Sequence, residues 1–153
     1  MVNFLNEVRL LPDYVLVSLD VVSLFTNIPK ALVLTIIEEE WESITELVKV
    51  PKNTLCNLIN VCFETSYFKF MDEFYLQLDR SSMGNPASPV LANIVMDYVL
   101  RKVMDSLPFQ VPFLRLYVDD TLLAVPEEEF DSLLDRLNSL CEKIQFTMEV
   151  ESN

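Results

Sequence analysis

The sequence predicts an α+β fold in which a mostly antiparallel sheet carries helices on one face. Two observations support this class: short apolar segments rich in β-branched and aromatic residues recur along the chain, and longer segments of helical periodicity separate them. The length of 153 residues suits one domain that can bury a substantial core. We therefore expect a single domain over residues 1–153, without internal repeats.

The first half of the sequence predicts a strand, two helices and a hairpin. An apolar, β-branched run (YVLVSL) is typical of a buried strand, and a proline precedes each helical pattern, where a helix tolerates it. In chain order the expected elements are a strand at Tyr14–Leu19, a helix from Pro29 to Val48, a helix from Pro51 to Phe63, and a hairpin of Tyr67–Phe70 with Phe74–Leu78 that turns at Met71-Asp72-Glu73.

The second half predicts a helix, a second hairpin, another helix and a last strand. A polar segment, Asp79–Ala87, precedes them and contains Gly84, the only glycine of the chain. The expected elements are a helix at Ser88–Asp105 with Ser88 as N-cap, a hairpin of Pro112–Leu116 with Leu122–Val125, a helix at Glu127–Lys143, and a strand at Gln145–Val150.

Composition excludes several classes of protein. The chain has no histidine, and its three cysteines lack metal-ligand spacing, so zinc sites and histidine-based catalysis are set aside. No apolar run approaches the roughly 20 residues that cross a bilayer. No secretory signal is visible, so we expect an intracellular protein, nuclear or cytoplasmic, without a membrane partner. The net charge of −13 argues against a nucleic-acid-binding surface unless basic segments lie outside this chain.

Two adjacent carboxylates, Asp119 and Asp120, are the residues with the clearest chemical potential. They lie between two short apolar runs and are therefore expected at the tip of a hairpin. Asp20 ends the first predicted strand, and if the two strands are neighbours, three carboxylates converge at one edge of the sheet. Oxygen donors without histidine or cysteine suit Mg²⁺ or Mn²⁺. The alternative is an exposed turn that is acidic by chance.

Four segments resemble, in order, motifs A, B, C and D of the reverse transcriptase of Penelope-like retroelements. They are Ser18–Pro29 (SLDVVSLFTNIP), Ser82–Ile94 (SMGNPASPVLANI), Tyr117–Leu122 (YVDDTL) and Ile144–Glu151 (IQFTMEVE). The resemblance spans roughly residues 10–151 and implies a polymerase palm-like fold. It also implies RNA-directed DNA synthesis, in which two Mg²⁺ or Mn²⁺ ions promote transfer of deoxynucleotides to a primer 3′-hydroxyl. The implied partners are an RNA template with a DNA primer and dNTPs.

The resemblance assigns roles to individual residues. Asp20 and Asp119 correspond to the principal metal ligands, Asp120 to the second carboxylate of the pair, and the Val21 carbonyl to a further ligand. The residues that correspond to nucleotide-binding positions are Phe25 as the gate against a ribose 2′-hydroxyl, Gly84 as the point of close backbone approach, Ser88 at the start of the motif B helix, and Gln77 before that motif. A core position for Phe25, a plain turn at Gly84 and simple capping by Ser88 stay open. Tyr117 corresponds to a residue under the primer terminus, with core packing as its alternative.

Some features depart from the family pattern. Arg80 stands where the family usually has glycine, and Asn85 stands where it has a small serine or threonine. The resemblance begins just before motif A and ends after motif D, so most of the fingers and all of the thumb are missing. The acidic charge fits a palm separated from its basic surroundings, and we expect the isolated chain to be inactive or nearly so.

Three hypotheses about function follow from these residues. The first is the catalytic palm of a reverse transcriptase, and the second is a decayed or domesticated palm that keeps the fold without polymerase activity. The third is an acidic α+β interaction domain with an accidental Asp-Asp turn. Intact Asp20, Asp119 and Asp120 favour the first hypothesis, whereas Arg80 and Asn85 favour the second.

Overall fold

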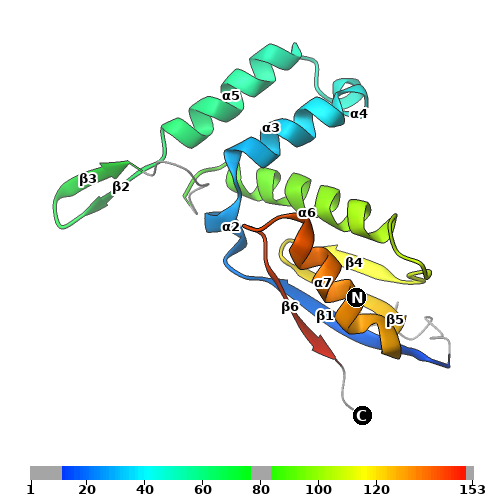
Figure 1. The fold of residues 1–153 in the computed structure, drawn as a ribbon. Coiled ribbons are helices and arrows are strands. Elements are labelled where there is room, and N and C mark those ends of the chain that lie inside the picture. Colours follow the sequence, from blue (N-terminus) through cyan, green and yellow to red (C-terminus); the bar gives the residue numbers. More distant parts are fainter. Residues whose placement is uncertain (1–11, 77–83, 151–153) are drawn as a thin grey trace. The chain divides into compact units, whose positions relative to one another are not determined.

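The computed structural model describes residues 12–76 and 84–150 (Figure 1). The chain divides into two compact units, Met1–Val22 with Val99–Asn153, and Ser23–Tyr98. We call the first the sheet unit and the second the helical unit. Two residues singled out from the sequence, Gln77 and Arg80, lie outside the described residues.

A four-stranded antiparallel sheet forms the centre of the sheet unit. The strand order is β4-β5-β1-β6, so that β1, from the start of the chain, lies between two strands from its end. The bounds are β1 Tyr14–Val21, β4 Leu114–Tyr117, β5 Asp120–Pro126 and β6 Phe146–Val150. The predictions of these strands, and of an antiparallel sheet with helices, are confirmed.

One face of this sheet is buried and the other is exposed, as the alternation along β1 demonstrates. Val17, Leu19 and Val21 are buried, whereas Ser18 and Asp20 between them are exposed. Helix α7 (Phe130–Leu140) covers the buried face (Figure 1). The buried apolar residues of the unit are Val17, Leu19, Val21, Val99, Leu100, Val103, Phe113, Leu123, Ala124, Val125, Leu133, Leu137, Ile144 and Phe146.

Helix α7 is shorter than the sequence predicts. A 3₁₀ turn at Glu127–Glu129 precedes it, and it ends at Leu140 instead of Lys143. The Gln145 side chain supplies the reason, because its Nε2 donates to the carbonyls of Asn138 at 3.2 Å and Cys141 at 3.3 Å. The amide satisfies carbonyls that a continued helix would have used, and the chain turns into β6.

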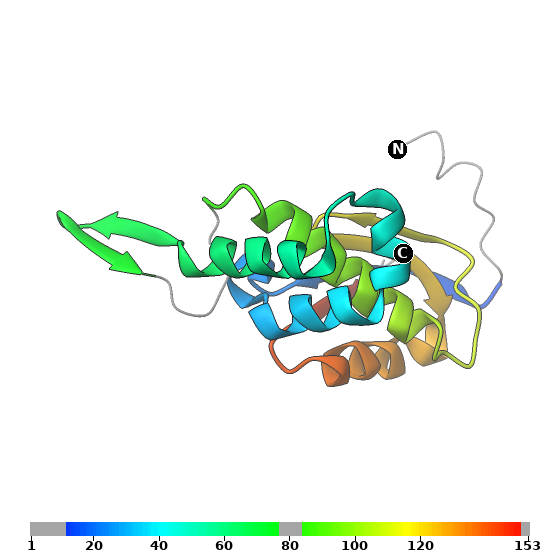
Figure 2. The same ribbon diagram turned by 90° about the horizontal axis from the view of Figure 1, so that it is seen from above.

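The described residues of the helical unit form six elements and the first part of a seventh. They are α2 Leu24–Asn27, α3 Lys30–Glu39, α4 Trp41–Leu47, α5 Lys52–Glu64, β2 Tyr67–Phe70, β3 Glu73–Leu76 and α6 Ser88–Met104, of which the residues up to Tyr98 belong to this unit. Helices α3 and α5 lie side by side (Figure 2). Two ion pairs, Lys30–Glu64 and Lys52–Glu38, join opposite ends of these antiparallel helices.

The long helix predicted from Pro29 to Val48 is two helices, so that prediction is wrong in its extent. The backbone leaves the helical region at Glu40, with φ −107° and ψ 16°. Val33, Ile36 and Ile37 of α3 are buried, but α4 has no buried residue. The apolar spacing therefore continues past Glu40 without a core to keep the backbone continuous.

The predicted helices from Pro51 and from Ser88, and the hairpin of β2 with β3, are confirmed. The hairpin turns at Met71 and Asp72, whose φ angles are 47° and 65°. Within the described ranges, no helix is both long and apolar enough to span a bilayer.

Candidate functional site

The hairpin of β4 and β5 turns through Val118 and Asp119, with Tyr117 paired to Asp120. Val118 has φ 60°, which is rare for a β-branched residue because its side chain crowds the backbone there. Positive φ at the first central residue alone is the pattern of a type II′ turn, which matches the twist of a hairpin. The strain at Val118 is therefore part of how the two carboxylates are presented.

The register of β1 and β5 brings Asp20 toward the same tip. Leu19 pairs with Thr121, so the next positions outward are Asp20 on one strand and Asp120 on the other. Opposite residues of antiparallel strands project from the same face. Leu19 and Thr121 are buried, whereas Asp20 and Asp120 are exposed, so both carboxylates lie on the face away from α7.

The other neighbour of Asp20 is Thr147 of β6. Val21 pairs with Phe146, and both side chains are buried, so the strand that carries Asp20 is paired on both sides and anchored in the core. Tyr117 is 72% exposed, and the alternative of core packing for it is therefore wrong. The strand that carries Asp20 and Val21 is thus paired on both sides, while the side chains of Asp20 and Asp120 are exposed and that of Asp119 is half-buried.

The chemistry of this donor set suits a hard divalent cation, because every side-chain donor is a carboxylate oxygen. In the described part of the chain, no lysine or arginine forms an ion pair with Asp20, Asp119 or Asp120. Across the same residues, however, no three Asp, Glu, Cys or His side chains gather closely enough to hold a metal ion. The structure therefore brings the strands together, and the complete metal site stays a prediction.

The remaining predicted residues belong to the helical unit. Phe25 is half-buried in α2, and Ser88 is 1% exposed as the first residue of α6. Ser88 was expected as the N-cap, but Asn85 Oδ1 accepts the N–H of Ala87 at 2.9 Å just before the helix. The start of α6 is therefore stabilised by an asparagine that the sequence marked only as a departure from the family pattern.

Gly84 has no structural reason to be glycine among the described residues. Its φ is not positive, and a Cβ added to it would meet no atom within 4 Å. A plain turn at this position therefore does not require glycine. Close approach of a ligand to the backbone would require it, because any side chain would be in the way.

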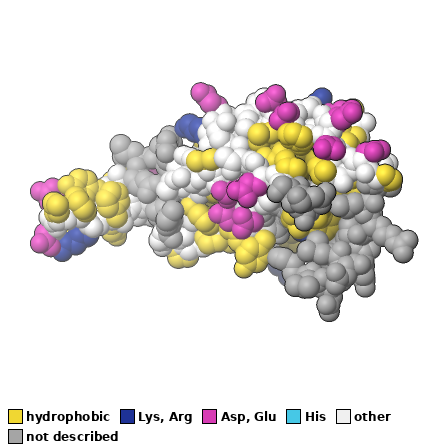
Figure 3. Space-filling view, turned by 90° about the horizontal axis from the view of Figure 1, so that it is seen from below, with side chains coloured by type: hydrophobic (Ala, Val, Ile, Leu, Met, Phe, Trp, Pro, Cys, Tyr) yellow, Lys and Arg dark blue, Asp and Glu magenta, His cyan; other side chains and the backbone are white. Residues whose placement is uncertain are grey.

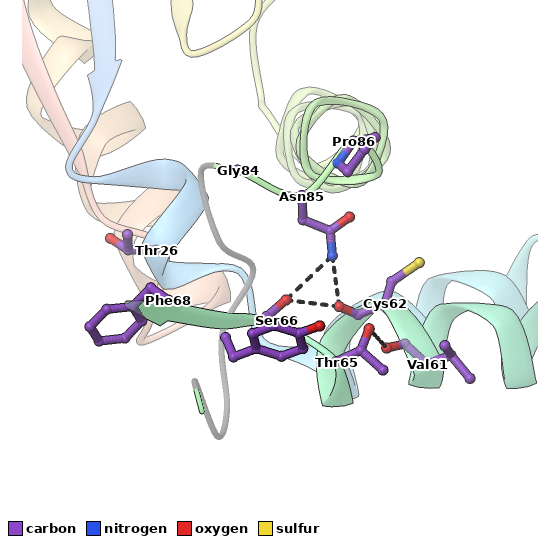
Figure 4. Close-up of a pocket in the computed structure, with 10 residues that line it drawn as sticks. Thr26, Val61, Cys62, Thr65, Ser66, Phe68, Gly84, Asn85 and Pro86 are labelled. Atoms are coloured by element: carbon purple, nitrogen blue, oxygen red, sulfur yellow. Dashed lines mark hydrogen bonds between the residues drawn. The ribbon is translucent and has the colours of Figure 1, made fainter. Parts of the chain in front are cut away.

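Gly84 lines a cavity of about 630 Å³ within the helical unit (Figure 4). Its other lining residues are Thr26, Val61, Cys62, Thr65, Ser66, Tyr67, Phe68, Asn85 and Pro86. The sequence did not indicate the contribution of Thr65 and Ser66, because polar residues between a helix and a hairpin are the usual composition of a connection.

The palm-like α+β fold and the carboxylates at the hairpin tip are together typical of a polymerase palm. The model of the reverse transcriptase (RNA-dependent DNA polymerase) family matches residues 8–151, and the chain belongs to this family. No curated protein matches the chain.

Solved structures confirm the palm-like fold. Apo telomerase from Candida tropicalis, truncated from its C-terminal domain, superimposes with a TM-score of 0.71 at 13% identity, over 99% of this chain and 33% of that one. Telomerase from Candida albicans in complex with a TWJ fragment of telomeric RNA gives 0.65 at 13% identity, over 99% of this chain and 28% of that one. The chain thus spans about a third or less of the telomerase chains that it resembles.

Proposed function

We propose that this chain is the catalytic palm core of an RNA-directed DNA polymerase of a Penelope-like retroelement, acting within a longer protein. The observation that carries the proposal is the register of β1 and β5. The positions next to the buried Leu19–Thr121 pair are Asp20 and Asp120, and both of these side chains lie on the exposed face of the sheet. Asp119 lies in the turn beside them. Membership in the reverse transcriptase family supports this class of reaction.

Asp20, Asp119, Asp120 and the Val21 carbonyl are the groups that would hold two Mg²⁺ or Mn²⁺ ions. When bound, such ions activate the primer 3′-hydroxyl and stabilise the leaving pyrophosphate. The chain itself fixes the separation of the two strands through the buried residues Leu19 and Thr121. Asp20 and Asp120 are exposed and Asp119 is half-buried, and no ion pair in the described part of the chain restrains their carboxylates from turning toward a cation.

The substrates in this proposal are dNTPs and a DNA primer on an RNA template. The C. albicans telomerase structure contains a fragment of telomeric RNA, which supports RNA as a partner. The net charge of −13 means that fingers and thumb segments must supply the basic surface. Such an enzyme acts inside the cell, in the nucleus or the cytoplasm.

The proposal is tested by primer extension on an RNA template, using this chain joined to fingers and thumb segments. We expect Asp119→Asn to lower extension by at least about a thousandfold, because it removes a charged ligand from a site that stabilises developing charge. Asp135→Asn, an exposed aspartate on α7, is the matched control and should keep full activity. Circular dichroism establishes that both variants are folded. Equal extension by wild type and Asp119→Asn shows that the site assignment is wrong.

A second candidate is a decayed palm that only binds or scaffolds. Two observations favour it: no three acidic side chains gather as a metal site in the described ranges, and Asn85 departs from the family pattern. This candidate predicts no extension with either cation even when the missing segments are supplied. Extension by wild type that requires Mg²⁺ or Mn²⁺ excludes it.

A further inference from the structure

The C-terminal end of α5 is capped by side chains that follow it. The Val61 carbonyl accepts the Thr65 N–H at 3.0 Å and the Thr65 hydroxyl at 2.7 Å. The Cys62 carbonyl accepts the Ser66 hydroxyl at 2.9 Å, and Ser66 is only 5% exposed. Carbonyls at a helix end lack intrahelical partners, so these two hydroxyls satisfy the last turn of α5.

Asn85 adds a connection from a distant part of the sequence. Its Nδ2 donates to the same Cys62 carbonyl at 2.7 Å and lies 3.4 Å from Ser66 Oγ (Figure 4). Its Oδ1 accepts the Ala87 N–H at 2.9 Å, and its backbone carbonyl accepts the Ser88 N–H at 3.0 Å. One side chain therefore begins α6 with its oxygen and attaches that beginning to the end of α5 with its nitrogen.

A shorter residue at this position cannot do both. A serine hydroxyl can accept the Ala87 N–H locally, as serine does in turns, but its side chain is one atom shorter and has no amide group to donate to the Cys62 carbonyl at the same time. The residue that departs from the family pattern is thus the one that makes the connection in this chain.

The connection controls the position of Gly84. Gly84 and Pro86 flank Asn85, and all three line the cavity of about 630 Å³, whose other wall includes Ser66 and Phe68. The φ of Gly84 is not positive, and a Cβ at this position would meet no atom within 4 Å. The Asn85 side chain next to it donates hydrogen bonds to the end of α5 and to Ser66, and these bonds hold the turn there.

We propose that Asn85 is a positioning residue that holds the Gly84 turn against the end of α5 and thereby sets the affinity of the cavity beside Gly84 for the incoming nucleotide. This inference rests on the proposed function for its effect on the nucleotide. The connection between Asn85, Cys62 and Ser66 does not depend on that function.

Asn85→Asp is the sharpest variant, because aspartate has nearly the same shape. Its carboxylate still accepts the Ala87 N–H, but an acceptor now faces the Cys62 carbonyl where a donor stood, and the two oxygens repel. Asn85→Gln keeps the amide group and serves as the conservative variant. Asn57→Asp makes the same chemical change at an exposed position of α5 and is the matched control.

The kinetic readout is steady-state primer extension by the chain joined to fingers and thumb segments. We expect Asn85→Asp to raise KM for dNTP by about tenfold, corresponding to roughly 1.4 kcal/mol, with kcat changed less than about threefold. Asn85→Gln should recover part of the loss, and Asn57→Asp should resemble wild type. An unchanged KM, or a fall in kcat that matches a fall in folded protein, overturns the proposal.

Hydrogen exchange on the chain alone tests the connection without activity. Asn85→Asp should speed amide exchange by about tenfold in segments 62–66 and 84–88, since both lose the hydrogen bonds that join them. Exchange that stays at the wild-type rate overturns the inference whatever the enzyme does. If the wild type extends no primer while exchange changes as expected, the proposed function fails and the positioning contact stands.

Discussion

The two hairpins in the described part of the chain both turn through residues with positive φ, but they differ in turn type and in what stabilises them: only Val118 has positive φ in one turn, whereas Met71 and Asp72 both have it in the other. The hairpin of β4 and β5 turns at Val118 and Asp119, and that of β2 and β3 turns at Met71 and Asp72. Each has a non-glycine residue with positive φ. Most of β5 is buried, whereas every residue of β2 and β3 is exposed. Buried residues therefore hold a strand beside the Val118–Asp119 turn, whereas the strands beside the Met71–Asp72 turn have no buried residue to hold them.

The hairpin of β2 and β3 depends instead on aromatic pairs across its strands. Phe68 and Tyr75 stack on one face at 5.6 Å with 18° between the rings, and Tyr67 meets Phe74 edge-on at 6.4 Å on the other. Hydrophobic side chains cover much of its surface, at the left of Figure 3. An isolated two-stranded hairpin is marginally stable, so we expect this one to open without unfolding of the rest.

The largest expected difference comes from one leucine in each hairpin. Leu123 in β5 is fully buried, so Leu123→Ala should lower the free energy of unfolding by about 2–5 kcal/mol. Leu76 in β3 is 52% exposed, and Leu76→Ala should cost less than about 1 kcal/mol. Urea unfolding followed by far-ultraviolet circular dichroism measures both. Similar losses for the two variants contradict the comparison.

A smaller effect is expected at Thr121, beside Asp120 in β5. Its side chain is fully buried, and Oγ1 has no hydrogen-bond partner among the described residues. Thr121→Val replaces the unpaired hydroxyl with a methyl group of similar size and should raise the free energy of unfolding by about 1–2 kcal/mol. The control is Thr147→Val at an exposed position of β6, which should stay within about 0.5 kcal/mol. A loss of stability in Thr121→Val means that the hydroxyl has a partner after all.

The sequence predicted the strands and helices well where one buried face produces a clear periodicity of apolar residues. The alternation in β1 and the repeat along α7 each report one buried face; β1 begins at the predicted residue, and α7 lies within its predicted range but is shorter at both ends. Ends that depend on side-chain hydrogen bonds were missed. Gln145 ends α7 three residues early, because its side-chain amide donates to carbonyls of the last turn. Such a cap depends on contacts between particular atoms, which periodicity does not record. The break at Glu40 was missed for another reason, because α4 has no buried residue although the apolar spacing continues through it.

The candidate site could likewise be predicted only in part from the sequence. Adjacent aspartates between apolar runs indicated the hairpin tip, and an aspartate at the end of a buried strand indicated its neighbour. The register that makes Asp20 and Asp120 neighbours could not be predicted from either segment alone. It depends on the pairing of β1 with β5, which are far apart in the sequence. The sequence marked Gly84 and Asn85, but it did not indicate that a cavity forms between them and Ser66, because these residues lie on either side of the β2–β3 hairpin.

The strain in the two turns gives the third prediction. Valine is branched at Cβ and methionine is not, so φ 60° at Val118 should cost more than φ 47° at Met71. Asparagine tolerates this region, and Val118→Asn should raise the free energy of unfolding by about 1 kcal/mol. Met71→Asn should raise it by less than about half as much. Chemical unfolding of both variants measures the difference, and destabilisation by Val118→Asn means that packing of the valine outweighs its strain.

The smallest expected effect is the coupling between Phe68 and Tyr75. Their stacked rings should contribute about 0.5 kcal/mol beyond the area that they bury. Global unfolding does not report on a hairpin that opens alone, so the population of the hairpin must be read from backbone chemical shifts. Phe68→Ala, Tyr75→Ala and the double variant complete the thermodynamic cycle. Additive losses mean that the rings do not interact, and the hairpin is then stabilised by its backbone hydrogen bonds and turn. A coupling near the expected value means that exposed aromatic pairs replace, on this hairpin, the core that fixes the Val118–Asp119 turn.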